Sequence, residues 1–242
     1  MIVYVLWMLG WLQTLARRDE DKGALGRHGL LLGSLVALLV ALPLVQTISG
    51  STPRFSILLT LVLVAAVLVN SHQRWIFVVA SLTGLGAVIG IAGAEFSGSS
   101  SLRLAAHLLS LGLLGFTTLV LLNSLIQANE VSRDTIVGGI CVYLLVGLCF
   151  GMAFLAIADL QPGAFVSQSE ALVPSLADTS ALATQLLYFS FVTLTTLGYG
   201  DITPVHDMAQ MLAVAEAIVG QLYLTIFVAR LVALYVGRAS KT

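Results

Sequence analysis

The stretch of sequence that decides the fold of this chain is Thr195-Thr196-Leu197-Gly198-Tyr199-Gly200-Asp201. Glycines at alternate positions permit backbone conformations that a side chain forbids, so successive carbonyl groups can point in the same direction. A row of such carbonyls can replace the water shell of a bare cation. The hydroxyl of Thr196 can add one more oxygen at the inner end of the row. The string therefore predicts an ion-coordinating strand, called here the filter segment (residues 195–201).

The composition indicates that most of this chain is surrounded by lipid. Of its 242 residues, 58% are hydrophobic and 10% are charged, and its mean hydropathy is +1.01. Soluble domains carry about 25% charged residues, so this chain lacks the polar surface to stay in water. Its net charge of −1 argues against a nucleic-acid partner. Cys141 and Cys149 are about 12 Å apart along one helix, too far for a disulfide, and are expected to be packing residues.

Long apolar runs predict membrane-spanning helices, because a span needs about 20 mostly apolar residues. The expected spans are residues 29–49, 55–71, 75–94, 102–127, 136–158 and 207–236. Residues 160–180 are expected to form a polar extracellular turret. The apolar stretch 181–194 is too short to cross a bilayer and predicts a re-entrant helix that leads into the filter segment. Non-helical backbone at membrane depth is tolerated where it is buried in protein or lines water.

The basic residues predict the orientation of the chain, because cytoplasmic connections are enriched in Lys and Arg. If the turret faces outward, the outward connections hold only Arg54 and Arg103. The remaining basic residues fall on the cytoplasmic side: Arg17, Arg18, Lys22, Arg27, Arg74, Arg133, Arg230, Arg238 and Lys241. We therefore expect a multi-pass protein of the cell (inner) membrane with both termini in the cytoplasm.

The N-terminal segment, residues 1–27, is expected to be cytoplasmic or interfacial. Residues 1–16 are apolar, carry Tyr4, Trp7 and Trp11, and end at a pair of arginines. An amphipathic helix that lies along the inner leaflet suits this pattern. A tilted extra span and a disordered segment are the alternatives.

The filter segment resembles the selectivity filter of potassium channels, in which Val is usual at the position of Leu197. The layout resembles prokaryotic six-transmembrane potassium channels of the voltage-gated-like superfamily, specifically over about residues 130–238 and only in architecture before that. The resemblance implies an all-α membrane protein with six transmembrane helices, a re-entrant pore helix and a homotetrameric pore, since one pore loop supplies a quarter of a ring. It implies K+ ions at Thr196, Leu197, Gly198 and Tyr199, with Gly200 completing the ion-binding row, and no organic cofactor.

The same resemblance divides the chain into two membrane domains. Residues 28–128 would form a four-helix domain similar to a voltage sensor but without its charges. Residues 129–242 would form the pore domain, with an outer helix at 136–158, a pore helix at 181–194 and an inner helix at 207–236. A voltage sensor needs several basic residues on one helix, and the fourth span offers only Arg103 and His107 near one end. Voltage gating is therefore expected to be weak or absent.

Residues around the filter segment are expected to support it. Thr195 and Asp201 are its first and last residues, and Tyr188, Phe189 and Phe191 on the pore helix resemble the aromatic cuff of related channels. Val192 stands where some channels place a carboxylate that pairs with the aspartate after the filter, so Asp201 is expected to lack that partner.

The last span is expected to line the pore. Gly220 is either a hinge or a site of close helix packing. Gln221, Leu224 and Val228 fall at helical spacing on the expected cavity face. Glu216 is costly inside a span, so it should be paired or face water, and a hydrogen bond behind the filter is one option. Arg230 is expected to extend toward the inner interface.

Charged and titratable residues outside the filter give weaker signals. Between Asp134 and Ala229 the sequence has no Lys or Arg. The acids expected near the outer mouth, where they would concentrate cations, are Asp159, Glu170, Asp178, Asp201 and Asp207. His107 and His206 are read as tolerated polar residues, with pH sensing as the less favoured alternative.

Taken together, the sequence favours a potassium-selective channel that conducts passively and is not an enzyme. The alternatives are a pore-like regulatory or receptor subunit, a weakly selective cation channel, and a membrane enzyme or transporter. An enzyme is disfavoured because the first four spans carry no nucleophile–base pair or metal-spaced ligands. A transporter is disfavoured because the sequence shows no inverted repeat. Membrane lipids are the expected surroundings, and a separate regulatory subunit or lipid stays open.

Overall fold

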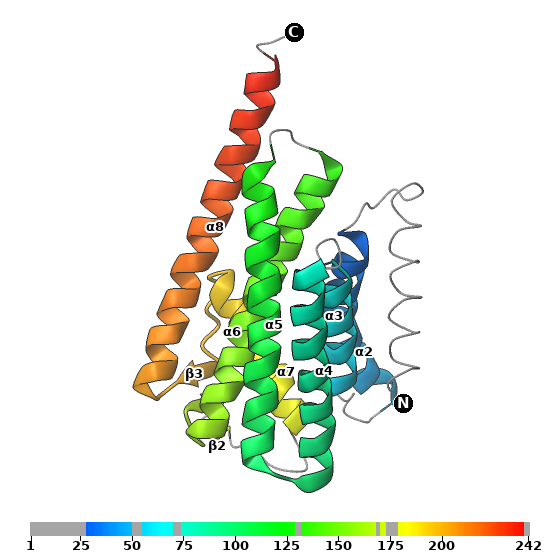
Figure 1. Cartoon of the computed structure of the whole chain (residues 1–242). Helices are drawn as coiled ribbons and strands as arrows, with labels where there is room; N and C mark the ends of the chain where they lie inside the picture. The colour runs from blue at the N-terminus through cyan, green and yellow to red at the C-terminus, as the bar shows by residue number, and fades with distance from the viewer. Residues whose placement is uncertain are drawn as a thin grey trace.

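The computed structural model describes residues 28–49, 55–69, 74–128, 132–167, 170–172 and 179–239. The interfacial helix expected within residues 1–27 lies outside the described residues, as do Arg54 and Asp178. The described chain is mostly helical (Figure 1). Its helices are α2 (Gly29–Ser49), α3 (Phe55–Val69), α4 (Arg74–Ser97), α5 (Ser100–Gln127), α6 (Arg133–Leu160), α7 (Thr179–Leu194) and α8 (Asp207–Ala239).

Polar residues determine where α5 and α6 begin. The Ser99 side chain accepts a hydrogen bond from the Leu102 amide and caps α5. Ser132 and Thr135 form a capping box, in which each side chain accepts from the other's backbone amide. Such caps satisfy amides that have no partner within the helix. α6 therefore begins at Arg133, before the start at residue 136 that hydropathy indicated.

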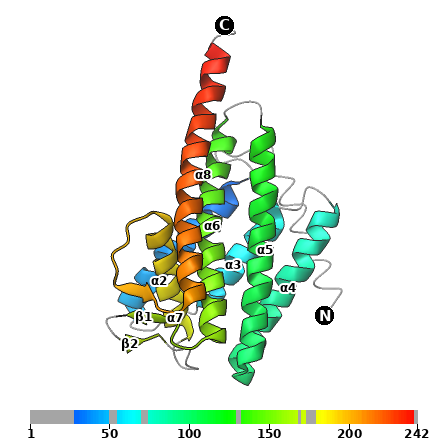
Figure 2. The same cartoon turned by 90° about the vertical axis from the view of Figure 1, so that its left-hand side faces the viewer.

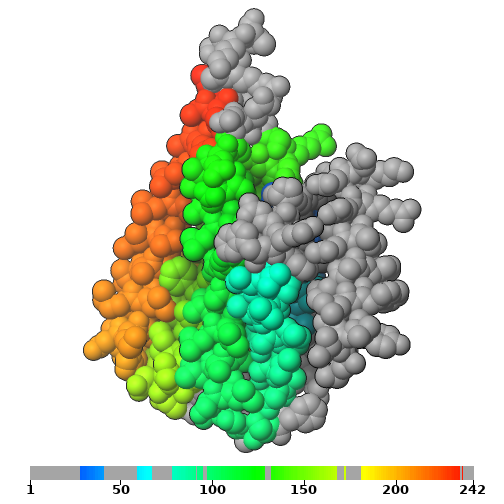
Figure 3. All heavy atoms as spheres, in the orientation of Figure 1, coloured from blue at the N-terminus to red at the C-terminus, as the bar shows by residue number. Residues whose placement is uncertain are grey.

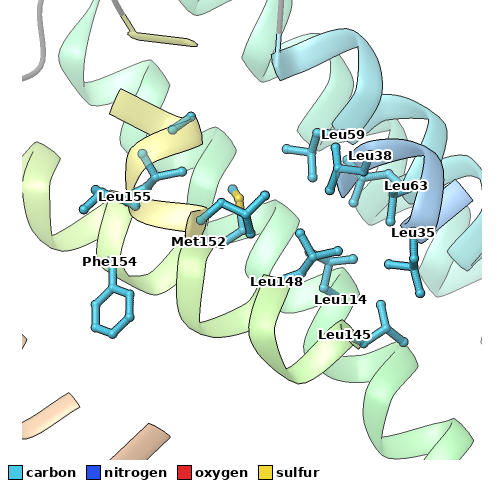
Figure 4. Close-up of a cluster of buried hydrophobic side chains, with 14 of the residues drawn as sticks. Leu35, Leu38, Leu59, Leu63, Leu114, Leu145, Leu148, Met152, Phe154 and Leu155 are labelled. Atoms are coloured by element: carbon cyan, nitrogen blue, oxygen red, sulfur yellow. The ribbon is translucent and has the colours of Figure 1, made fainter. Parts of the chain in front are cut away.

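The helices α2 to α6 pack through aliphatic side chains. α5 makes its most extensive contacts with α6 and α4, and α2 contacts both α3 and α6. Figure 4 shows leucines of α2 and α3 facing those of α6, with Leu114 of α5 beside them. All the labelled side chains are almost completely buried: Leu35, Leu38, Leu59, Leu63, Leu114, Leu145, Leu148, Met152, Phe154 and Leu155. In lipid, such packing stabilises through van der Waals contact rather than through removal of apolar surface from water.

A small sheet corrects the expectation of an all-helical chain. β1 (Phe165–Ser167) lies between β2 (Glu170–Ala171) and β3 (Ile202–Pro204), and both pairings are antiparallel. The expected polar turret therefore contributes strands and a buried side chain, Phe165. The strands are two or three residues long, too short to show the alternation by which a strand is recognised in sequence. Because β3 directly follows the filter segment, the sheet attaches its outer end to the connection after α6.

Within the described ranges, three helices are long and apolar enough to cross a membrane. They are Ser100–Gln127, Arg133–Leu160 and Asp207–Leu234. The stretches Gly29–Val40, Val78–Ala94 and Ala181–Leu194 are apolar but shorter. The last of these lies within α7, where the sequence predicts a helix too short to span.

α8 runs along one side of the molecule and extends beyond the other helices at its C-terminal end (Figures 1 and 3). It packs against α7 and α6. Only a narrow stripe, with Ala209, Glu216 and Gly220, is buried by this chain. The remaining faces expose large apolar side chains, among them Met211, Val214, Ile218, Leu222, Ile226 and Val232. Figure 2 shows α7 and the sheet beside the N-terminal half of α8, which places the filter segment at that end of the molecule.

Candidate functional site

The filter segment is held by the end of α7. The amides of Leu197 and Gly198 both donate to the carbonyl oxygen of Val192, at 2.9 and 3.3 Å. The Thr196 amide donates to the Thr193 carbonyl at 2.9 Å. The last carbonyls of a helix have no partner within it, so this return of the chain satisfies them. Val192 thus supports the filter segment through its backbone carbonyl. The residue type at this position gave no reason to expect that role.

The backbone of the filter segment alternates in handedness. Thr196, Gly198 and Gly200 have φ values of +59°, +59° and +75°. A β-branched residue such as threonine rarely adopts positive φ, and strained backbone of this kind concentrates at functional sites. Alternation of right- and left-handed residues turns successive peptide groups the same way. Among the described residues, no hydrogen bond ends on a carbonyl oxygen of residues 196–200. This leaves a row of unpaired acceptors of the kind that suits a dehydrated cation.

Gln221 of α8 contacts the inner end of the filter segment. Its Nε2 donates to Thr196 Oγ1 at 3.3 Å. Leu224 and Val228, which share its side of the helix, are exposed in this chain. The structure therefore brings Gln221 and Thr196 together, whereas the lining of a cavity by Gln221, Leu224 and Val228 stays a prediction.

Asp201 has a partner that sequence reasoning missed. Val192 supplies no carboxylate, as expected, but the Tyr188 hydroxyl donates to Asp201 Oδ2 at 2.8 Å. The two residues are 13 apart in sequence, and they meet because the filter segment runs back alongside α7. Tyr188 thus links α7 to the outer end of the filter segment. Thr195, at the other end, donates its hydroxyl to the Phe191 carbonyl at 2.6 Å.

We expect the variant Tyr188→Phe to destabilise the outer end of the filter segment. K+ flux through reconstituted protein should decay about two- to threefold faster, a modest effect because exposed polar contacts are weakened by water. Sustained flux recordings measure the decay. Asp201→Asn keeps an acceptor oxygen for Tyr188, so its rate of decay should stay near that of the wild type even if the lost charge lowers the initial flux. Equal decay of Tyr188→Phe and the wild type would show that the contact has no role.

The aromatic residues of α7 do not form one cuff within this chain. Phe189 packs edge-on against Phe154 and Phe165, with ring centroids 5.0 and 5.6 Å away. Phe191 contacts α6 at Gly147, where an added Cβ would lie 2.7 Å from its ring. Tyr143 of α6, not singled out from the sequence, donates to the Leu194 carbonyl at 3.3 Å. Each aromatic therefore fixes a different point on or near α7.

Gly220 is a site of close helix packing. A Cβ at this position would overlap the carbonyl oxygen of Leu194, the last residue of α7. α8 continues through Gly220 without a break. Of the two interpretations that the sequence left open, the structure favours packing.

Glu216 is buried, and one of its oxygens contacts the Ser190 hydroxyl. This agrees with the option of a hydrogen bond behind the filter. Ser190 could have been noticed as a polar residue within the apolar stretch of α7, but nothing in the sequence pairs it with α8.

Asp159 does not contribute a free charge to the outer mouth. Arg103 Nε and His107 Nδ1 of α5 lie 2.6 and 2.7 Å from its carboxylate oxygens, and its side chain is only 3% exposed. The three residues meet because α5 and α6 are antiparallel neighbours, which brings the start of one beside the end of the other. Asp159 is therefore removed from the expected cation-concentrating acids, whereas Asp201 and Asp207 are exposed. His107 is a hydrogen-bond partner of Asp159 rather than an isolated polar residue.

Two further residues have specific partners. Arg230 Nη2 donates to the carbonyls of Ile126 and Ala128, at 2.6 and 2.8 Å, so it connects α8 to the end of α5. The expectation that Arg230 extends toward the inner interface stays a prediction, and this contact is compatible with it because the end of α5 is expected on the same side. His206 Nδ1 accepts from the Met208 amide at 3.2 Å and caps the start of α8.

Comparison with known protein families identifies the same part of the chain. Residues 142–236 match the protein family Ion_trans_2, described as "Ion channel". A segment of 89 residues, 37% of this chain, is 33% identical to "Two pore potassium channel a" of Oryza sativa subsp. japonica. A segment of 88 residues, 36% of this chain, is 36% identical to "Two pore potassium channel c" of the same plant. The matched segments make up 21% and 17% of the lengths of these relatives. No solved structure matches the chain.

The matched region contains the filter segment, α7 and nearly all of α8. The matched family is one of ion channels and both relatives are named as potassium channels, which are not enzymes, so the comparisons support a potassium channel. With its long apolar helices, the chain is a multi-pass membrane protein with an ion-channel domain.

Proposed function

We propose that this chain is one subunit of a homotetrameric channel that conducts K+ passively and selectively across the cell membrane. Four filter segments would surround a common axis, with K+ held by oxygens of Thr196, Leu197, Gly198 and Tyr199. The observation that carries this proposal is the row of carbonyls at 196–200, unpaired within the described residues and alternating in backbone handedness.

The exposed surfaces of the single chain support assembly. Leu197 and Tyr199 are 58% and 67% exposed, although large apolar and aromatic side chains beside a filter need rigid packing. Most of α8 is likewise uncovered by the rest of the chain. Neighbouring copies arranged about one axis would cover both, because each copy presents the same surface.

The same proposal assigns the described helices to the membrane. All of α2 to α6 and α8 would cross it, with residues 28–128 forming a four-helix domain and residues 129–242 forming the pore. The uneven distribution of Lys and Arg supports cytoplasmic termini. Voltage should have little effect on opening, since Arg103, the basic residue within α5, is already paired with Asp159.

The test is cation flux into proteoliposomes that contain the purified protein. We expect K+ uptake that exceeds Na+ uptake and is blocked by Ba2+, a divalent ion of similar size to K+. Equal Na+ and K+ permeability would indicate a weakly selective cation channel. No flux from correctly assembled protein would favour a regulatory or receptor subunit.

The contact between Gln221 and Thr196 predicts a specific change in block. Gln221→Leu removes the donor that orients the Thr196 hydroxyl, the innermost expected ligand. We expect Ba2+ applied from the cytoplasmic side to block about tenfold less tightly, because one hydrogen bond that orders the site is lost. Dose–response curves of K+ flux give the affinity. Gln210→Leu is the matched control: Gln210 lies on the same helix, contacts Pro204 instead, and should leave block unchanged.

A further inference from the structure

Three helices meet at one hydroxyl behind the filter segment. Ser190 of α7 and Glu216 of α8 are both 0% exposed. Ser190 Oγ lies 2.5 Å from Glu216 Oε1 and 2.7 Å from the carbonyl oxygen of Gly147 in α6. Both distances are hydrogen-bond distances, and each contact therefore needs a proton between its two oxygens.

The number of protons available to these contacts determines the protonation state of Glu216. A serine hydroxyl carries one proton, and a backbone carbonyl can only accept. If that proton bonds to Gly147, the contact with Glu216 has a proton only when the carboxyl group supplies it. If the carboxylate were ionised, one of the two short contacts would join two oxygens with no proton between them. Only a protonated Glu216 gives each of these short contacts a proton of its own.

The charges around Glu216 agree with this count. Among the described residues, the close contacts between basic and acidic side chains involve Asp134 and Asp159, and none includes Glu216. The sequence has no Lys or Arg between Asp134 and Ala229. Within the described chain, Glu216 Oε2 has no hydrogen-bond partner. An ionised carboxylate without a counter-charge is very costly in such a place, whereas a neutral carboxyl group is tolerated.

We propose, on the basis of the channel function above, that Glu216 is held protonated and is a positioning residue for the filter segment. The Glu216 proton bonds to Ser190, and the Ser190 proton bonds to the Gly147 carbonyl. This relay fixes α7 to α6 and α8 two residues before Val192, whose carbonyl holds the amides of Leu197 and Gly198. Glu216 also lies one helical turn before Gly220, which touches the end of α7. The relay therefore sets the position from which the filter segment begins.

The presence of a proton on Glu216 is tested by infrared spectroscopy of the purified protein. The difference spectrum between wild type and Glu216→Gln should show a carbonyl stretch of a protonated carboxylic acid that the variant lacks. Bands of an ionised carboxylate in its place would overturn the proposal. This measurement needs no ion flux, so it gives an answer even if the channel function is wrong.

The positioning role is tested by selectivity. The amide group of Glu216→Gln can still donate to Ser190, so its K+ over Na+ permeability ratio should stay within about twofold of wild type. Glu216→Ala and Ser190→Ala break the relay and should lower the ratio about tenfold. Ser110→Ala is the control, since Ser110 is equally buried but bonds only to the Ala106 carbonyl of its own helix.

Each result decides the question. A Glu216→Gln protein that fails to assemble, or that loses selectivity as Glu216→Ala does, contradicts the relay, because the amide should replace the acid. An equal loss in Ser110→Ala and Ser190→Ala would show general destabilisation instead. Absence of any cation flux in the wild type would refute the channel, while the infrared band would still report on the proton.

Discussion

Gly198→Ala is expected to abolish K+-selective flux. Gly198 has a φ of +59°, and an added Cβ would meet no atom of this chain within 4 Å. The penalty is therefore conformational, about 1–2 kcal/mol for each left-handed alanine, and a fourfold ring would contain four of them, about 4–8 kcal/mol in total. The filter segment can relieve this strain if residue 198 returns to negative φ. This change turns a peptide group and moves its carbonyl out of the row. K+ flux should fall to the level of liposomes without protein.

The matched control for this variant is Gly112→Ala. Gly112 is an exposed glycine in the middle of α5, and its added Cβ also meets no atom within 4 Å. Its helical backbone accepts alanine, so the substitution should stabilise the protein by about 0.5–1 kcal/mol and leave flux unchanged. Thermal unfolding and K+ flux measure the two effects. If Gly198→Ala conducts like wild type, the left-handed conformation is unnecessary and the filter interpretation is wrong.

Gly220→Ala is expected to have the next largest effect. The new methyl group would overlap the Leu194 carbonyl, which belongs to the backbone at the end of α7 and cannot rotate aside as a side chain would. α8 must therefore move away from α7, at a cost of about 1–3 kcal/mol in each subunit. Movement there also affects the contact between Gln221 and Thr196, one residue further along α8. We expect less assembled protein, a lower melting temperature and reduced K+ over Na+ selectivity.

This variant also separates the two interpretations of Gly220. If Gly220 served only as a hinge, Gly220→Ala would make α8 harder to bend but would keep its packing against α7. Assembly and melting temperature would then stay near the wild type, while opening of the channel would change. Gel filtration and thermal unfolding in detergent distinguish these cases, with Gly112→Ala again as the control. Wild-type assembly of Gly220→Ala would contradict the packing interpretation.

Local sequence signals predicted much of the fold. The apolar runs located the helices, because a segment surrounded by lipid must be apolar along its whole length. The string 195–201 predicted an irregular strand after a short helix, because glycines in that spacing have few other uses. The structure shows both, with α7 ending at Leu194 and positive φ at Gly198 and Gly200.

Contacts between distant residues could not be predicted in this way. The position of Asp159 predicts an acid at the outer mouth, yet its side chain contacts Arg103 and His107, more than fifty residues away in sequence. The position of Tyr188 predicts a cuff residue, yet its hydroxyl reaches Asp201. Residue type shows that a polar group needs a partner, but only the packing of antiparallel helices decides which partner lies within reach.

The sequence by itself determined the lipid surroundings, the helix positions and the row of filter carbonyls, since each follows from residues that are neighbours along the chain. The tertiary structure alone decided how α6, α7 and α8 meet behind that row, at Ser190, Glu216 and Gly220. The physical reason is the distance along the chain over which each kind of interaction acts. Hydropathy and backbone preference act over one or two helical turns, whereas a shared proton or a touching carbonyl depends on how whole helices pack.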